Sequence, residues 1–159
     1  MDVMHELFEV QAKRAPDRTA LRSGATALSY ADLNSRASRL AQALRARGVG
    51  RGQRIGLCIE RGADMLAAVL GILKAGAAYV PLDPSFPQER LRFMAQDAEL
   101  ILLVSTTALA GAFGLPRERQ LLLDADAGSI AAAPATRLPV DAHGARAEDP
   151  AYVIYTSGS

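Results

Sequence analysis

The sequence predicts an α/β fold, a layered and mostly parallel sheet with helices on both of its faces. From Arg54 onward, short apolar segments of strand length alternate with segments of helix length, and strands joined in this way pair in parallel through right-handed crossovers. The run 100–104 has no polar alternation, as expected of a strand that is covered on both faces. Half of the residues are hydrophobic and 22% are charged, a balance typical of a folded α/β domain.

The first elements predicted are a helix and a hairpin. Apolar residues recur at helical spacing over 3–14, and Pro16 ends this helix. Two short extended segments, 19–22 and 27–29, flank a Ser-Gly pair. This arrangement is typical of a β-hairpin.

A clearer helix begins at Ser29. Its spacing to Asp32 is that of a capping box, in which the first side chain accepts a hydrogen bond from the backbone three residues later. Gly48 is a natural end for the helix. One apolar stripe predicts the buried face: Leu33, Ala37, Leu40, Ala41 and Leu44.

The alternating region predicts four strands and three helices. The strands are predicted at 55–59, 77–82, 100–104 and 120–123. Two helices are predicted at 63–74, which is apolar nearly all round, and at 106–112. The third follows 85–88 and presents one inner face of Leu91, Met94, Ala95 and Ala98.

The end of the chain carries the most informative chemistry. An irregular surface segment rich in Ala, Pro and Gly is predicted over 125–150, with one helical turn near Ile130. A strand then follows at 151–155 and enters the turn Thr-Ser-Gly-Ser at 156–159. Glycine lets the backbone approach an anion closely, and successive N–H groups and hydroxyls donate to it. The turn is therefore a candidate phosphate-binding site.

Composition excludes several other function classes. The net charge of +1 argues against a nucleic-acid or membrane-surface partner. No apolar run reaches the length of a membrane span, and the start of the chain lacks the pattern of a signal peptide. A single cysteine fits a reducing compartment, so we expect a cytoplasmic protein.

Other reactive side chains are better explained as structural. Cys58 lies within a predicted strand and is expected to be a buried, inert thiol. Lys74 ends an apolar helix, where its charge complements the helix dipole. The two histidines, His5 and His143, are too scattered for a zinc site, so no metal ligands are predicted. The arginines at 45, 47, 51 and 54 lack interleaved aromatic residues and are expected to form a solvated surface.

Several stretches together resemble the amino-acid-activating (adenylation) domains of nonribosomal peptide synthetases, which belong to the adenylate-forming, AMP-binding superfamily. Residues 28–34, Leu-Ser-Tyr-Ala-Asp-Leu-Asn, are similar to the first core motif. Residues 73–84, Leu-Lys-Ala-Gly-Ala-Ala-Tyr-Val-Pro-Leu-Asp-Pro, match the second closely. Residues 155–159 resemble the opening of the third, phosphate-binding motif, and 87–91 agree with the family pattern Pro-x-Glu-Arg-Leu. The resemblance covers essentially the whole chain.

The resemblance implies the opening portion of the large N-terminal subdomain of an adenylate-forming enzyme, with 1–159 truncated inside its phosphate-binding loop. Such domains use ATP and Mg²⁺ to convert an amino-acid carboxylate into an aminoacyl-adenylate, which they transfer to the phosphopantetheine thiol of a carrier protein. ATP binding is implied for Thr156, Ser157, Gly158 and Ser159, and no catalytic residue is implied, because the family's catalytic lysine belongs to a later segment. The implied partners are the amino acid, the rest of the domain, a peptidyl carrier protein and a neighbouring condensation domain.

Two alternatives stay open at this stage. The isolated chain is expected to be inactive, so it is either a piece that works when joined to the remainder, or a non-catalytic interaction unit or relic of a broken synthetase gene. Within the enzyme class, an acyl- or aryl-acid-activating AMP-forming ligase is the competing assignment. The residues at 77–84 favour an amino acid as the substrate, but the residues that would select the substrate are not in this sequence.

Overall fold

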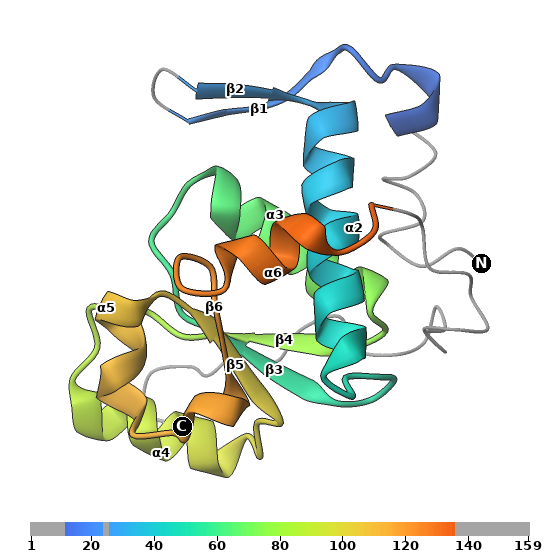
Figure 1. Cartoon of the computed structure of the whole chain (residues 1–159). Helices are drawn as coiled ribbons and strands as arrows, with labels where there is room; N and C mark the ends of the chain where they lie inside the picture. Colours follow the sequence, from blue (N-terminus) through green and yellow to red (C-terminus); the bar gives the residue numbers. More distant parts are fainter. Residues whose placement is uncertain (1–11, 24–25, 136–159) are drawn as a thin grey trace.

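A four-stranded parallel sheet forms the centre of the molecule (Figure 1). The computed structural model describes residues 12–23 and 26–135. The strands lie in the order β4-β3-β5-β6, with bounds β3 Arg54–Leu57, β4 Ala78–Pro81, β5 Leu102–Ser105 and β6 Gln120–Leu122. The predicted α/β architecture is confirmed. The predicted strand at 151–155 lies outside the described residues, as does most of the predicted 3–14 helix, of which 12–14 are helical.

The hairpin and the capped helix form as the sequence predicts. Strands β1 (Thr19–Ser23) and β2 (Thr26–Ser29) pair antiparallel as a separate two-stranded sheet. Helix α2 (Tyr30–Ala46) follows directly, and the Ser29 Oγ accepts a 3.1 Å hydrogen bond from the Asp32 N–H. Past the end of the helix, Gly48 adopts a φ of +88°, a left-handed conformation that favours glycine. All members of the predicted apolar stripe are buried.

Helices α2 and α3 (Ala63–Lys74) cover one face of the sheet. Their inner side chains pack with residues of β3, β5 and β6 in one cluster that includes Leu44, Ile55, Ile72, Val104 and Leu121. The two helices approach each other closely at Gly71, where an added Cβ would lie 2.9 Å from the Leu40 Cδ2 and 3.1 Å from the Ala37 carbonyl oxygen. The bounds of α3 are those predicted.

The opposite face is covered by α4 (Gln88–Asp97), α5 (Thr107–Ala110) and the 3₁₀ turn η1 (Gly111–Phe113). The predicted inner face of α4 is buried: Leu91, Met94, Ala95 and Ala98. The predicted 106–112 helix is shorter than expected, because its last turn tightens into η1 and Gly114 follows at a φ of +65°. Both faces of the parallel sheet are thus covered, in agreement with its apolar strands.

The chain after β5 crosses to the far edge of the sheet and then returns to the α2/α3 face. A second 3₁₀ turn, η2 (Arg117–Arg119), leads into β6. Helix α6 (Ala127–Ala132) comes next and packs against α2, with Ile130 partly buried against the α2/α3 cluster (Figure 1). This helix stands where the sequence predicts a helical turn, and the predicted irregular segment lies outside the described residues from 136 onward.

Candidate functional site

The described part of the candidate site is the carboxyl edge of the parallel sheet. The predicted phosphate-binding residues Thr156, Ser157, Gly158 and Ser159 lie outside the described residues. In open parallel sheets, ligands bind beyond the carboxyl ends of the strands, where the strand order reverses. Here the chain proceeds from β3 to β4 on one side and to β5 on the other, so this point lies between β3 and β5.

The ends of β3 and β5 are fastened to each other at this point. The Cys58 N–H donates to the Val104 carbonyl at 3.0 Å, which continues the ladder beyond β3. The Ser105 Oγ donates a 2.6 Å hydrogen bond back to the Cys58 carbonyl, and both residues are buried. Glu60 and Arg61, which follow at the surface, therefore project from a fixed base.

Two hollows flank Glu60 and Arg61. One, of about 490 Å³, lies at the ends of β3 and β4 and is also lined by Asp83 and Phe86. The other, of about 420 Å³, lies toward the ends of β5 and β6 and is also lined by Thr106. Arg61 thus lines both hollows, and each hollow is lined by both apolar and charged residues.

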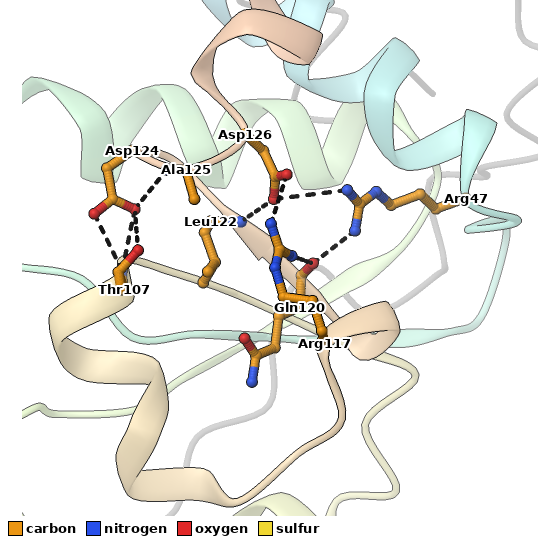
Figure 2. Close-up of polar contacts among 8 residues, drawn as sticks. All are labelled: Arg47, Thr107, Arg117, Gln120, Leu122, Asp124, Ala125 and Asp126. Atoms are coloured by element: carbon orange, nitrogen blue, oxygen red, sulfur yellow. Dashed lines mark hydrogen bonds and ion pairs between the residues drawn. The ribbon is translucent and has the colours of Figure 1, made fainter.

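Two aspartates occupy equivalent places at this edge. Asp83 follows β4, and its Oδ1 accepts hydrogen bonds from the Ser85 N–H at 2.9 Å and from the Ser85 Oγ at 2.7 Å. Asp124 follows β6 and accepts from the Ala125 N–H at 2.8 Å and from the Thr107 N–H and Oγ1, each at 3.1 Å (Figure 2). The Asp83 carboxylate fixes its own loop, whereas the Asp124 carboxylate joins the loop after β6 to the start of α5.

These hydrogen bonds favour the ionised form of both carboxyls. The backbone N–H of Ser85, followed by its hydroxyl, lowers the pKa of Asp83, and the nearby positive charge of Arg61 lowers it further. For Asp124, the backbone N–H groups of Ala125 and Thr107 lower the pKa. The carboxyl edge therefore presents fixed negative charges beside Arg61.

A third aspartate, Asp126, is part of a polar cluster beside β6 rather than of the carboxyl edge (Figure 2). Its carboxylate accepts a 2.7 Å hydrogen bond from the Arg117 guanidinium and another of 2.7 Å from the Leu122 N–H. Arg47 lies 3.6 Å from the same carboxylate. Burial alone would raise the pKa of Asp126, but the hydrogen bonds from Arg117 and Leu122 and the charges of both arginines outweigh it and lower the pKa.

The other sequence candidates have structural roles. Cys58 is buried as predicted. Burial, with the charges of Asp83 and Glu60, raises the pKa of its thiol to about 11, which disfavours the reactive thiolate. Lys74 is 2% exposed in the last turn of α3. Arg45 and Arg54 donate to backbone carbonyls at 3.0 and 3.2 Å, which ties them to the fold.

Metal and membrane features are lacking in the described ranges. No three His, Cys, Asp or Glu side chains gather there into a group able to hold a metal ion. Over residues 12–23 and 26–135, no helix has the length and apolar character that crossing a membrane requires.

Glu60 and Arg61 form a part of this edge that was not predicted from the sequence. A signal was present, since both residues directly follow an apolar strand of a predicted parallel sheet. What the sequence lacked was the strand order, and without it the reversal point between β3 and β5 is unknown.

Comparisons with known proteins agree with this architecture. The profile of the AMP-binding enzyme family matches residues 8–159. Tyrocidine synthase 3 of Brevibacillus parabrevis is 42% identical over 98% of this chain, and bacitracin synthase 1 of Bacillus licheniformis is 44% identical over 98% of it. This chain spans only 2% and 3% of those two relatives.

A solved structure of the nonribosomal peptide synthetase FmoA3 superposes with a TM-score of 0.87 at 34% identity, covering 98% of this chain and 16% of that one. Its AMPPNP-bound form superposes with a TM-score of 0.86 at 35% identity, with the same coverage. Sequence and structure therefore agree over nearly the whole chain, which belongs to the AMP-binding enzyme family of AMP-forming ligases.

Proposed function

We propose that this chain is the opening part of an amino-acid adenylation domain in a nonribosomal peptide synthetase. The observation that carries the proposal is its identity of 41–44% to several peptide synthetases over 98–99% of its length. A structure of FmoA3 bound to α-methyl-L-serine-AMP superposes on this chain with a TM-score of 0.87. This likeness supports amino-acid activation. The chain spans 16–17% of the FmoA3 structures, so the complete activity requires the remainder of the domain.

In the proposed reaction, a carboxylate oxygen of the amino acid attacks the α-phosphorus of ATP. The bond from that phosphorus to the bridging oxygen breaks, and pyrophosphate leaves with the negative charge. Backbone N–H groups and hydroxyls of Thr156 to Ser159 would donate to this charge from a fixed turn. Mg²⁺ would enter bound to the triphosphate. The aminoacyl group would then pass to the phosphopantetheine thiol of a peptidyl carrier protein in the cytoplasm.

The described carboxyl edge supplies only some of the groups that would bind the phosphates of a nucleotide. Arg61 supplies a cation to both hollows, and Thr106 supplies a hydroxyl to one. Glu60 and Asp83 are acidic, and Asp83 is occupied by its hydrogen bonds to Ser85. The main anion donors are therefore expected from the turn at 156–159 and not from the described edge.

Amino-acid-dependent ATP–pyrophosphate exchange tests this proposal. The chain is combined with the remainder of an adenylation domain, fused in frame or added in trans, and the twenty common amino acids and a set of fatty and aryl acids are supplied in turn. Exchange with an amino acid supports the proposal. Exchange only with a fatty or aryl acid would assign the chain to the other ligases of the superfamily, and no exchange with any acid would favour the interaction unit or relic.

A matched pair of serine variants tests the phosphate turn. Ser157→Ala removes one hydroxyl donor and is expected to lower the exchange rate on the order of 10²-fold. Ser129→Ala removes an exposed serine of α6 and is expected to leave the rate unchanged. Equal rates for the two variants would contradict the assignment of Ser157.

A further inference from the structure

A cavity of about 300 Å³ lies on the α4 side of the sheet. Leu100, which lines it, comes just before β5, and Arg119, which also lines it, comes directly before β6. The cavity therefore lies toward the amino ends of these strands. It shares no lining residue with the hollows beside Glu60 and Arg61 at the carboxyl edge, so the proposed function makes no use of it.

Two arginines are anchored across this cavity in opposite directions. Arg92 belongs to α4, and its Nε donates a 3.0 Å hydrogen bond to the Ala112 carbonyl in η1. Arg119 belongs to η2, and its guanidinium donates to the Leu100 carbonyl, just after α4. Each of these bonds uses one N–H of a guanidinium that carries several. Both residues are exposed, so an incoming anion can reach positive charges that are already held in place.

Gly114 fixes the position of Arg92 from a second side. It has a φ of +65°, and an added Cβ would lie 3.2 Å from the Arg92 Nη2 and 3.4 Å from its Cζ. The absence of a side chain therefore lets the guanidinium lie directly against the backbone. With the bond to Ala112, this contact leaves the guanidinium little freedom to lose when a ligand binds.

Glu99 adds a negative charge to the same lining. Its φ of +54° lies in the left-handed region, which costs stability for any residue other than glycine. Backbone strain of this kind is often retained where the side chain has a function. The amide of Gln96 lines the cavity as well. The cavity thus offers fixed charges of both signs and a neutral polar group.

The rest of the lining is apolar. Leu100 and Phe113 are buried members of the α4-side core, and Leu115 is partly buried against it. A volume of about 300 Å³ is at the lower end of the range of about 300–1,000 Å³ for small-molecule pockets. The ligand should therefore be small and carry a hydrocarbon part.

We propose that this cavity binds a free amino acid with an apolar side chain, in its zwitterionic form. The carboxylate accepts hydrogen bonds from Arg92 and Arg119, and the ammonium group donates to Glu99. The side chain packs against Phe113 and Leu115. A simple organic anion would bind the arginines but be repelled by Glu99, and the several charges of a nucleotide would be repelled more strongly. A zwitterion satisfies the charges of both signs.

This inference goes beyond the proposed function and does not depend on it. A ligand held by Arg92, Glu99 and Arg119 would join α4 to η1 and η2. Binding to the folded chain alone stabilises it by mass action. The cavity would therefore let the concentration of a free amino acid act on the stability of this part of the molecule.

Titration of the isotope-labelled 159-residue chain with L-leucine, followed by NMR of the backbone N–H signals, tests the proposal. The signals of Gly114 and Leu115 report on the cavity, and that of Gly48, beyond α2, is the reference. Isocaproate is leucine without the ammonium group, and isoamylamine is leucine without the carboxylate. Leucine is expected to shift the cavity signals saturably, and each analogue to bind about tenfold more weakly, as for the loss of one charged hydrogen bond.

Two variants with matched controls separate a role in binding from a role in folding. Glu99→Gln keeps the size of the side chain, so it should weaken leucine binding about tenfold and strengthen isocaproate binding, because the repulsion is gone. Arg119→Gln should weaken both ligands. The controls are Glu89→Gln, at the exposed start of α4, and Arg14→Gln, also exposed. Neither control residue lines the cavity, and both variants should bind as the parent chain does.

Three results would each overturn the proposal. They are the absence of saturable shifts at Gly114, isocaproate binding to the parent chain as tightly as leucine, and an equal loss of both ligands in Glu99→Gln. The titration uses no ATP and no other part of the domain. It can therefore fail while amino-acid-dependent exchange stands, and exchange can fail while the cavity binds leucine.

Discussion

The Ser105 hydroxyl donates a 2.6 Å hydrogen bond to the carbonyl oxygen of Cys58, and both residues are buried. This bond joins the carboxyl ends of β5 and β3 at the point where the strand order reverses. Ser105→Ala leaves the buried carbonyl without this donor and is expected to lower the free energy of unfolding by about 1–3 kcal/mol. Urea unfolding measures the change, with Ser129→Ala on the surface of α6 as the control. Equal midpoints for the two variants would show that this bond contributes nothing.

The Asp126 cluster makes stability depend on pH. Since the pKa of Asp126 is lower in the folded than in the unfolded chain, the carboxylate stabilises the fold above the unfolded value of about 3.9. This stabilisation is lost as the pH falls through the folded pKa. Asp126→Asn is expected to be less stable by about 1–3 kcal/mol at pH 7. The difference should shrink below about pH 4, as shown by urea unfolding across the pH range. A difference independent of pH would contradict this assignment.

Glu99 holds a backbone conformation that favours glycine. It lies just after Ala98, the C-cap of α4, at a φ of +54°, and glycine is the usual residue where a helix ends in the left-handed region. Glu99→Gly is expected to raise the free energy of unfolding by about 1 kcal/mol. Glu99→Ala, which removes the charge and keeps the Cβ, should show no such gain. An equal gain for both variants would attribute the effect to charge instead of backbone strain.

Gly56 in β3 has no side chain, and this lets the Leu100 and Leu103 side chains pack closely against its backbone. A Cβ at this position would lie 2.5 Å from the Leu100 Cδ1 and 3.1 Å from the Leu103 Cδ1. Gly56→Ala is therefore expected to destabilise the fold by about 1–3 kcal/mol. Gly128→Ala is the matched control, because a Cβ there meets nothing within 4 Å and alanine favours a helix. Thermal unfolding of both variants compares them, and a stable Gly56→Ala variant would require β3 or Leu100 to shift.

The Cys58 thiol should react only when the fold opens. Its pKa is raised to about 11, and its side chain is buried, so little thiolate is present at pH 8 and it is shielded from reagents. Iodoacetamide labelling followed by mass spectrometry is expected to be slow in buffer and fast in urea. Rapid labelling in buffer would indicate local opening at the end of β3.

Local elements were predictable because their signals are local. The Ser29 cap, the bounds of α3 and the buried face of α4 depend on spacings within one helix, and each is confirmed. The order of the strands depends on contacts between distant segments. The hydrogen bond from Arg47 to the Gln120 carbonyl joins residues 73 positions apart, and no periodic pattern indicates it.

The candidate site was predictable in chemistry but not in place. The turn at 156–159 follows from residue types that bind phosphate, and it stays a prediction. Its surroundings require the sheet order, which brings Arg61 after β3 and Asp83 after β4 to the same hollow. Arg61 and Asp83 follow different strands, so periodicity gives no indication that they line the same hollow.

The polar cluster around Asp126 occupies the outer edge of β6, because the Leu122 N–H donates to Asp126 and the Gln120 carbonyl accepts from Arg47 and Arg117. This occupied edge bears on how the chain folds during its own synthesis. Most of the contacts that close this edge come from residues 117–126, so they can form as soon as this stretch leaves the ribosome. At usual synthesis rates of about 5–20 residues per second, residues 127–155 take about 1.5–6 s more. During that interval β6 is closed to strands of neighbouring nascent chains, while β4, the other outer strand, has no further described strand beside it. A polysome making this chain would therefore face its risk of mispairing at β4.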